Sequence, residues 1–258
     1  MTTRSPPGRD HRSIDVVILS WNDGPLLQRA IDSVHRSEAV AARCVVVDNG
    51  SDQRPNAQLG AGDLLITLPH NVGVAAGRNN GAWRGTAPLV CFLDSDAVLH
   101  ADTLRRLADV LDTHPRIALA APVFDHQEPT DSGGLAPTFR RKLDRALGST
   151  SAYAAGTERE GLIDVDFTIG ACQLFRREAF EAVGGLDERY FYGPEDADFG
   201  MRLRLHGWRV VQVPGAGCEH PPRRRNRKIL TRRGMRHAGA VIRFLWQHRR
   251  FHSEAPST

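Results

Sequence analysis

Short apolar runs that alternate with helical segments constrain the fold of this chain more than any other feature of its sequence. The apolar runs are rich in β-branched residues, which favours buried strands, expected at 14–19, 44–47, 64–68 and 89–93. Helical spacing of apolar residues, or bounding glycines, predicts helices at 25–37, 74–85 and 102–112. Strands that are apolar on both faces indicate a parallel sheet covered by helices on both sides, so the sequence predicts an α/β fold.

Polar residues stand where several of these strands end. Asn22 follows the first strand, Asp48 closes the second, and Asp94 and Asp96 follow the fourth. In open α/β sheets, ligands bind beyond the carboxyl ends of the strands. We therefore expect a polar ligand-binding site at this edge of the sheet.

The second half of the chain is less regular. Residues 125–163 are rich in Gly, Ser, Ala and Arg with little periodicity, and they are expected to form a mobile loop region. Beyond them the pattern predicts an ordered run at 167–175, helices at 177–183 and 196–206, a strand at 209–213, and a basic, partly amphipathic helix at 229–248.

The composition is that of a soluble globular protein. With 258 residues, 41% of them hydrophobic and 25% charged, the chain fits one α/β domain with at most a short appendage. Residues 1–12 are polar, lack the apolar stretch of a signal peptide and are expected to be disordered. No apolar run approaches the roughly 20 residues that span a bilayer. The four cysteines are far apart and form no CxxC pair, which favours a reducing cytoplasm.

The net charge of +4 is unevenly spread, because residues 223–236 form a basic strip. Such a strip suits an anionic partner, although an ordinary solvated face explains it about as well. Nucleic-acid binding usually interleaves basic with aromatic residues, and this strip holds no aromatic residue, so no nucleic acid is expected. Peripheral contact with an anionic membrane, from its cytoplasmic face, remains open.

Asp94-Ser95-Asp96 places two carboxylates around one small residue just after a buried strand. Carboxylate oxygens suit Mg²⁺ or Mn²⁺, especially when phosphate oxygens complete the shell. An ordinary turn is the alternative reading. His220 lies in the loop after the last strand and could complete a mixed oxygen–nitrogen shell, although a single histidine is more often structural.

Two further segments suit a nucleotide. Asp48 could accept hydrogen bonds from a ribose or a base, and Asp-Asn-Gly-Ser is also a strong turn sequence. The run from Asn71 to Gly81 is rich in small residues, which let a backbone approach a ligand closely, and its Arg78 could reach a diphosphate. Helix–sheet packing explains these glycines as well. The run is neither GxGxxG nor a Walker loop, which disfavours the ordinary dinucleotide and NTPase sites.

Glu195 and Asp196 open a predicted helix and follow the aromatic segment 190–194. Acidic residues at a helix start are partly explained by capping and by the helix dipole. The aromatic lead-in would also exclude water around a carboxylate, which suits a general base.

Taken in order, these segments resemble the family 2 glycosyltransferases. The resemblance runs from about Ile14 to His220, and the bacterial rhamnosyl- and galactofuranosyltransferase-like members are the most similar. It rests on VVILSWN, VVVDNGS, NVGVAAGRNNG, FLDSDAVL and GACQLFRREAFEAVGGLDERYFYGPEDADFGMRLRLHGW. It implies the GT-A fold, a mixed, mostly parallel sheet flanked by helices, at 13–221, with a basic helical tail at 222–258.

The resemblance also implies roles for individual residues. Asp196 would be the catalytic base, with Glu195 as the alternative base or as a group that orients the acceptor. Mn²⁺ or Mg²⁺ would be held by Asp96, Asp94 and His220. The nucleotide sugar would be bound by Ser20, Asn22, Asp48, Asn71, Gly73, Arg78, Asp94 and Ser95. The acceptor side would be lined by Gly170, Ala171 and Cys172.

The expected function is therefore that of an inverting, metal-dependent glycosyltransferase. The donor would be a UDP-, dTDP- or GDP-linked sugar, and the acceptor a hydroxyl of a glycan, a lipid-linked molecule or a small molecule. A sugar nucleotidyltransferase would normally carry a glycine-rich basic loop after the first strand, where this chain has SWNDGPL. A nucleotide-sugar-binding protein without transferase activity is the other alternative, and the complete set of acidic motifs disfavours it.

Overall fold

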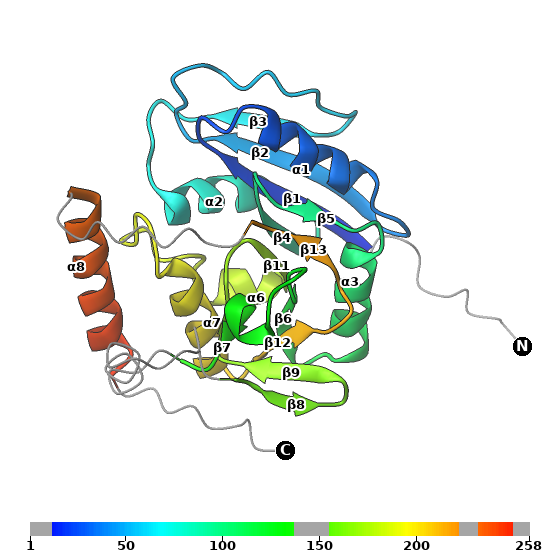
Figure 1. Ribbon diagram of the computed structural model, residues 1–258, viewed down its shortest axis with the longest axis vertical. Coiled ribbons are helices and arrows are strands. Elements are labelled where there is room, and N and C mark those ends of the chain that lie inside the picture. Colours follow the sequence, from blue (N-terminus) through cyan, green and yellow to red (C-terminus); the bar gives the residue numbers. More distant parts are fainter. Residues whose placement is uncertain (1–11, 137–154, 222–231, 250–258) are drawn as a thin grey trace, which may run out of the picture.

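A nine-stranded mixed sheet forms the centre of the protein in the computed structural model, which describes residues 12–136, 155–221 and 232–249 (Figure 1). The strand order is β3-β2-β1-β4-β11-β6-β12-β9-β8. These strands are β1 (Ser13–Ser20), β2 (Ala41–Asp48), β3 (Leu64–Thr67), β4 (Leu89–Asp94), β6 (Ile117–Pro122), β8 (Thr157–Arg159), β9 (Leu162–Val165), β11 (Cys172–Arg176) and β12 (Arg209–Val213).

The first four strands of this order pair in parallel, as do β6 and β12. Strand β11 lies between β4 and β6 and runs antiparallel to both, and β9 and β8 continue the sheet antiparallel to β12. The expected α/β fold with a mixed, mostly parallel sheet is therefore confirmed.

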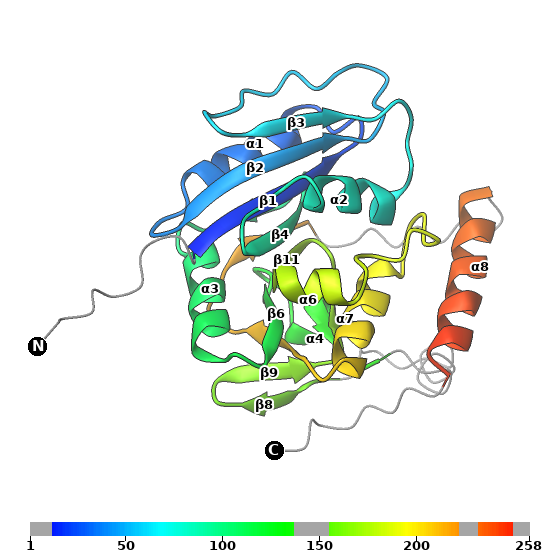
Figure 2. The ribbon, with the colours of Figure 1, turned by 180° about the vertical axis from the view of Figure 1, so that it is seen from behind.

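Helices cover both faces of the sheet (Figures 1 and 2). The apolar sides of α1 and α3 pack on one face, and those of α2, α6 and α7 pack on the other. The consecutive residues Val16 and Val17 of β1 point to opposite faces of the sheet and belong to two different cores. This explains why the strand is a continuous apolar run. The helices are α1 (Pro25–His35), α2 (Val74–Ala82), α3 (Thr103–Thr113), α4 (Pro129–Ser132), α6 (Arg177–Ala182), α7 (Glu195–Leu205) and α8 (Arg232–Gln247).

Two short ribbons lie outside the main sheet. Strand β5 (Val98–Leu99) pairs with β13 (Cys218–Glu219), and β7 (Gly133–Gly134) pairs with β10 (Phe167–Thr168). The first ribbon joins the segment after Asp96 to the segment before His220, and so brings together residues that are far apart in the sequence.

A third, smaller core lies under α8. Phe244 of α8 packs there with Tyr190, Phe167 and Met201, which come from the segment before α7, from β10 and from α7. The last helix is therefore docked on the same part of the fold that carries Glu195 and Asp196. In the part of the chain that the structure describes, no helix combines the length and the apolarity needed to cross a membrane.

Several expectations for the second half are wrong. The region 125–163 is not all loop, because β9 and β8 within it extend the main sheet. Strand β6 was not predicted at all. The order expected at 167–175 is present, in the form of two strands, β10 and β11, that belong to different sheets. The expected disorder at 1–12 and the basic strip 223–236 fall largely on residues 1–11 and 222–231, and part of the expected loop falls on residues 137–154, all of which lie outside the described residues.

Candidate active site

Asp94 and Asp96 stand at the carboxyl end of β4, next to His220. Asp94 is the last residue of β4, and the β5–β13 ribbon pairs Val98 with Glu219, which places His220 beside the segment that holds Asp96. The imidazole Nε2 lies 3.8 Å from Asp94 Oδ2 and 3.7 Å from Asp96 Oδ1. The structure thus brings together the three residues expected to bind a metal.

The donor set of this cluster fits a divalent cation. The three ligand atoms lie within 4.8 Å of one another, and the two carboxylates are 37% and 38% exposed, so one side of the cluster faces solvent. Burial raises the pKa of Asp96, the Asp94 carboxylate raises it further, and His220 acts in the opposite direction. Two carboxylates and one imidazole with an open side are a suitable set for Mn²⁺ or Mg²⁺ completed by water or phosphate.

Arg78 lies beneath this cluster and is almost fully buried. Its guanidinium donates to Asp94 Oδ1 at 2.5 Å and to the carbonyl of Gly170 at 2.7 Å, and it lies over the ring of Phe92. Its Nη1 is 3.8 Å from Glu195 Oε1. The side chain was expected to reach the base or the diphosphate, but in the structure it is committed to protein groups. Its observed part is to hold Asp94 in place.

Asp196 and Glu195 form the first turn of α7, close to the same framework. Asp196 Oδ2 accepts a hydrogen bond from the Gly170 amide at 3.2 Å, and Oδ1 accepts one from the Ala197 amide at 2.8 Å. Because Gly170 also accepts from Arg78, a chain of hydrogen bonds links Asp94 through Arg78 and Gly170 to Asp196. The aspartate pair at the end of β4 and the acidic pair of α7 are therefore held in one arrangement.

Glu195 is buried and carries an unusual proton affinity. Burial raises its pKa to about 7, the Asp196 carboxylate contributes to the rise, and Arg78 opposes it. Its Oε2 is a buried atom without a hydrogen-bond partner in the described structure. A carboxyl group of this kind exchanges its proton near neutral pH.

The segment Gly170–Cys172 connects these groups through its backbone. Ala171 accepts a hydrogen bond from the Asp94 amide at 2.9 Å, and a Cβ on Gly170 would stand 2.3 Å from the Arg78 guanidinium. The side chain of Cys172 lies in the core with those of Cys91 and Cys218, so it does not face an acceptor as expected. All four cysteines are buried free thiols.

The loops after β1 and β2 are clamped together. Asn22 exchanges two hydrogen bonds with Asp52, and its backbone amide donates to the Ser51 hydroxyl. Asp23 accepts from the hydroxyl of Ser95 at 2.6 Å, which ties the first loop to the Asp94–Asp96 segment. Sequence reasoning missed Asp23, although its place directly after the first strand was the available signal.

Asp48 and Ser20 end neighbouring strands in register with each other and are buried. Asp48 Oδ1 accepts from the Ser51 amide at 3.0 Å, so the turn anticipated from the sequence is present. This turn leaves Asp48 at the carboxyl end of β2, beside the loop of Asn22.

Asn71 and Gly73 lie where the loop before α2 meets the aromatic segment before α7. The amide oxygen of Asn71 accepts from the Gly73 amide and from the side chain of Asn49. Gly73 has a φ of 92°, and a Cβ there would stand 2.7 Å from the carbonyl oxygen of Phe191. The glycine therefore permits a close approach of two protein backbones.

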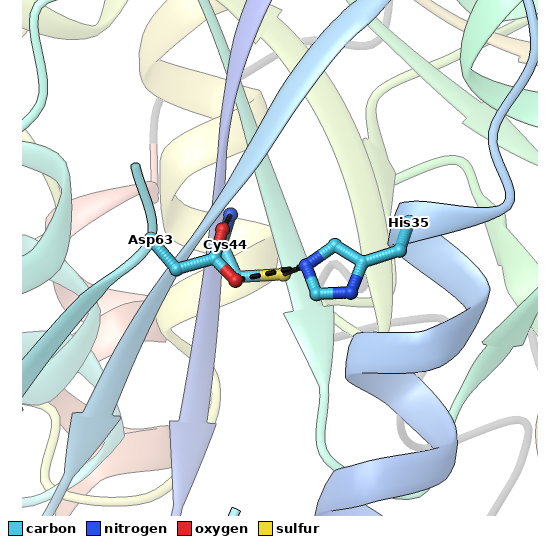
Figure 3. A group of neighbouring side chains, drawn as sticks. All are labelled: His35, Cys44 and Asp63. Carbon is cyan, nitrogen blue, oxygen red and sulfur yellow. Dashed lines mark hydrogen bonds and ion pairs between the residues drawn. The ribbon is translucent and has the colours of Figure 1, made fainter. Parts of the chain in front are cut away.

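A second cluster of potential ligands, His35, Cys44 and Asp63, joins α1 to β2 and the start of β3 (Figure 3). Asp63 accepts from His35 Nε2 at 2.8 Å, from the Cys44 amide at 2.7 Å and from the Gly60 amide at 2.7 Å. Burial raises the pKa of the Cys44 thiol, which keeps it protonated. These contacts give the cluster a structural part in the fold, away from the carboxyl ends of the strands.

Known proteins with related sequences transfer sugars. Residues 15–184 match the family model described as Glycosyl transferase family 2, and residues 163–223 match the one described as the N-terminal domain of galactosyltransferase. The N-acetylglucosaminyl-diphospho-decaprenol L-rhamnosyltransferase of Mycobacterium tuberculosis is 28% identical over 80% of this chain and 75% of its own length. The pre-mycofactocin glycosyltransferase of the same organism is 30% identical over 89% of this chain, which spans only 47% of that relative.

Solved structures share the fold at low sequence identity. A mannosyltransferase from Pyrobaculum calidifontis, solved with GDP-Man and Mn²⁺, has a TM-score of 0.64 at 19% identity over 94% of this chain and 66% of its own. GalNAc-T7, solved with UDP, GalNAc and Mn²⁺, has a TM-score of 0.64 at 17% identity over 81% of this chain and 43% of its own. The chain therefore belongs to glycosyl transferase family 2 and is a glycosyltransferase with the GT-A fold.

Proposed function

We propose that this protein is a metal-dependent, inverting glycosyltransferase that moves a sugar from a nucleoside diphosphate to an acceptor hydroxyl. The observation that carries the proposal is the joint placement of two acidic groups. Asp94 and Asp96 converge with His220 at the end of β4, and Asp196 is joined to Asp94 through Arg78 and Gly170. One group suits a diphosphate bound with a cation, and the other suits a hydroxyl that must lose a proton.

Asp96, Asp94 and His220 would hold the divalent cation. The cation would neutralise charge on the diphosphate, which makes a nucleoside diphosphate a better leaving group. Asp94 can share in this because its Oδ1 is engaged by Arg78 while its Oδ2 faces His220. The Asp23–Ser95 hydrogen bond keeps the intervening residue of the Asp94–Asp96 segment in place.

We assign Asp196 as the general base. It would accept the proton of the acceptor hydroxyl while the oxygen attacks the anomeric carbon from the face opposite the diphosphate, so that one displacement inverts the configuration. Two backbone amides fix the carboxylate, and a base held by the backbone does not need to reorganise during the reaction. Glu195 is the alternative base, and its raised pKa makes the two assignments separable by pH.

The nucleoside would lie over the loops that follow β1 and β2. Asn22, Ser20 and Asp48 stand at the carboxyl ends of these strands, where ligands of α/β sheets bind. Asn71, Gly73 and Ser95 would close the same region from the α2 and Asp94–Asp96 sides. We propose 13–221 as the transferase domain, with the basic tail outside it.

A lipid-linked acceptor is the favoured class. The rhamnosyltransferase relative is named for a decaprenyl diphosphate-linked sugar, and it aligns with 80% of this chain. The acceptor would approach the segment 190–194. The backbone of Gly170 and Ala171 would support this side of the site.

Replacement of Asp196 by Asn tests the base. A thermal-shift screen of UDP-, dTDP- and GDP-sugars with Mn²⁺ identifies the donor, because a bound ligand stabilises the fold by mass action. With that donor, Asp196→Asn is expected to lower kcat by about 10²- to 10⁴-fold while it keeps the donor-induced shift. Asp109→Asn, which changes a partly exposed aspartate on α3, is the matched control and should keep full turnover. Full turnover of Asp196→Asn would show that the base is elsewhere.

Chelation and Asp96→Asn test the cation. EDTA is expected to abolish the donor-induced thermal shift, and added Mn²⁺ should restore it. Calorimetric titration of Mn²⁺ should show at least about tenfold weaker binding to Asp96→Asn, because one of three protein ligands loses its charge. A donor-induced shift that is unchanged by EDTA contradicts the assignment of this cluster.

A further inference from the structure

The last turns of helix α8, from Gly239 on, have an inner face that is engaged with the rest of the protein. Phe244 is buried in the third core, and His248, just after the helix, pairs with the buried carboxylate of Asp198 at 2.8 Å. Gln247 donates to the same carboxylate at 2.9 Å and accepts from Arg189 at 3.1 Å. These contacts fix the orientation of the helix, and with it the direction of its opposite face.

The opposite face presents large apolar side chains to solvent. Ile242 is 69% exposed and Trp246 is 68% exposed, one helical turn apart. Gly239 and Arg243 lie on the same side, and with Arg189 they line a shallow surface hollow around the two apolar residues. The guanidinium of Arg249 lies over the Trp246 ring, 4.4 Å from its centroid.

This combination is unfavourable in water and favourable at a membrane surface. An exposed tryptophan and isoleucine gain free energy when their apolar area leaves water, and tryptophan is enriched at the headgroup level of bilayers. Arginines beside them are attracted to anionic headgroups. The surrounding sequence adds to that attraction, because residues 223–253 contain eleven Lys and Arg and no Asp or Glu.

We propose that the outer face of α8, formed by Gly239, Ile242, Arg243, Trp246 and Arg249, docks on an anionic phospholipid bilayer. Trp246 and Ile242 enter the headgroup region, and Arg243 and Arg249 contact lipid phosphates. This deepens the proposed function, because a lipid-linked acceptor must be met at a membrane surface. Phe244 shares a buried core with Tyr190 on the inner face of α8, so this one helix separates the docked membrane from the segment that leads into Glu195 and Asp196.

Vesicle binding of the whole chain tests the proposal. The protein is expected to co-sediment with vesicles of phosphatidylcholine and phosphatidylglycerol, and much less with phosphatidylcholine alone. The double variant Ile242→Gln/Trp246→Gln should lower the partition coefficient by at least about tenfold, because two large apolar side chains no longer enter the bilayer. Leu205→Gln, which removes a 63% exposed leucine from α7, is the matched control and should bind like the wild type.

The contribution of the arginines to vesicle binding is tested separately. Arg243→Gln should weaken binding to the anionic vesicles by several-fold, because each basic residue near such a surface contributes about 1 kcal/mol. Arg116→Gln, which removes an exposed arginine between α3 and β6, should leave binding unchanged. Helices α3 and α8 lie on opposite sides of the molecule (Figure 1). Brominated lipids should quench Trp246 emission in the wild type, as judged by difference against Trp246→Phe.

Three results would overturn the proposal. The first is wild-type binding that the double variant leaves unchanged, and the second is no binding of the wild type to anionic vesicles. The third is a dimer in sedimentation equilibrium that the double variant dissociates, which would make this face a contact between copies. The donor-induced thermal shift with Mn²⁺ needs no membrane, so a failure of the proposed transferase function remains distinguishable from a failure of membrane docking.

Discussion

Arg78 shows how one buried side chain organises the candidate active site. Its guanidinium holds Asp94 and the Gly170 carbonyl and stands near Glu195, while the ring of Phe92 covers it. An arginine keeps its charge under all ordinary conditions, so it suits a buried position that several carboxylates share. A lysine at this position could not reproduce the planar fork of donors.

Glu195 makes the stability of the protein depend on pH. Its pKa is raised from 4.5 to about 7 by burial and by Asp196, so the folded state binds its proton more tightly than the unfolded state. The stabilisation by this group is complete below about pH 4.5 and is lost as the pH rises through 7. Glu195→Gln should remove this loss, on the order of 2–3 kcal/mol between pH 5 and 8, in chemical denaturation experiments.

Glu178→Gln is the control for this measurement, because Glu178 is an exposed residue of α6. It should leave the slope of unfolding free energy against pH unchanged. If Glu195→Gln has the same slope as the wild type, Glu195 is ionised in the folded state over the whole range, and the raised pKa is wrong.

At the scale of elements, the loop before α2 and the segment before α7 meet through Gly73. The Val74 amide donates to the Phe191 carbonyl at 2.7 Å, and Gly73 leaves no room for a Cβ beside the same carbonyl. The two segments come from the proposed nucleotide side and the proposed acceptor side of the site. Their contact makes the position of the aromatic segment depend on α2.

Gly73→Ala should therefore displace the segment 190–194. We expect it to lower stability by about 1–3 kcal/mol through a positive φ and a steric clash, and to raise the acceptor KM more than the donor KM. Gly62→Ala is the matched control, because Gly62 has a similar φ of 95° but open space around its Cβ position. It should cost stability through backbone strain alone and leave both KM values unchanged. If Gly73→Ala had the same acceptor KM as the wild type, the contact between Gly73 and Phe191 would not influence acceptor binding.

The sequence predicted the elements of the first half well, because each strand there is a continuous apolar run with polar residues after its end. Strand β6 was missed because IALAAP is rich in alanine, which is depleted in strands, and ends in proline. Order was expected at 167–175, where β11 begins, but neither the strand nor its antiparallel direction was predicted, since an apolar run reads the same in both directions. Strands β9 and β8 are short, and β8 is exposed, so they give no periodicity.

The candidate site was predictable to the same degree. Asp94, Asp96 and His220 were named from their places in the sequence, and the ribbon that joins them is two residues long in each strand. Burial could not be predicted. Arg78 was expected at the ligand and Cys172 at the acceptor, and both side chains instead lie inside the protein, because tertiary packing decides which way a side chain points.

At the scale of the whole molecule, Asp15 ties the beginning of the sheet to its second half. The carboxylate is fully buried in β1 and accepts from Arg43 of β2 at 2.6 Å and from Arg177 of α6 at 2.8 Å. The Ala87 amide completes the set at 2.8 Å. Residues 162 positions apart in the sequence are thus joined in one buried ion cluster.

Asp15→Ala should destabilise the protein by about 3–5 kcal/mol in denaturant unfolding, because it leaves two arginines with an uncompensated charge. The matched control is Asp102→Ala, which breaks ion pairs with Arg105 and Arg106 at the surface and should cost less than about 1 kcal/mol. If both variants lost the same free energy of unfolding, the burial of the Asp15 cluster would add nothing to stability.

The strand order of the sheet also has a consequence for synthesis on the ribosome. Strands β3, β2, β1 and β4 use residues 13–94 alone, so this half of the sheet can assemble as soon as it has emerged. Strand β6 emerges next but pairs only with β11 and β12, whose residues are translated more than 50 positions later. During that interval the edge of β4 and the whole of β6 are unpaired apolar strands, the kind of surface that chaperones cover. We therefore expect nascent chains stalled between residues 122 and 172 to be the species most dependent on chaperones.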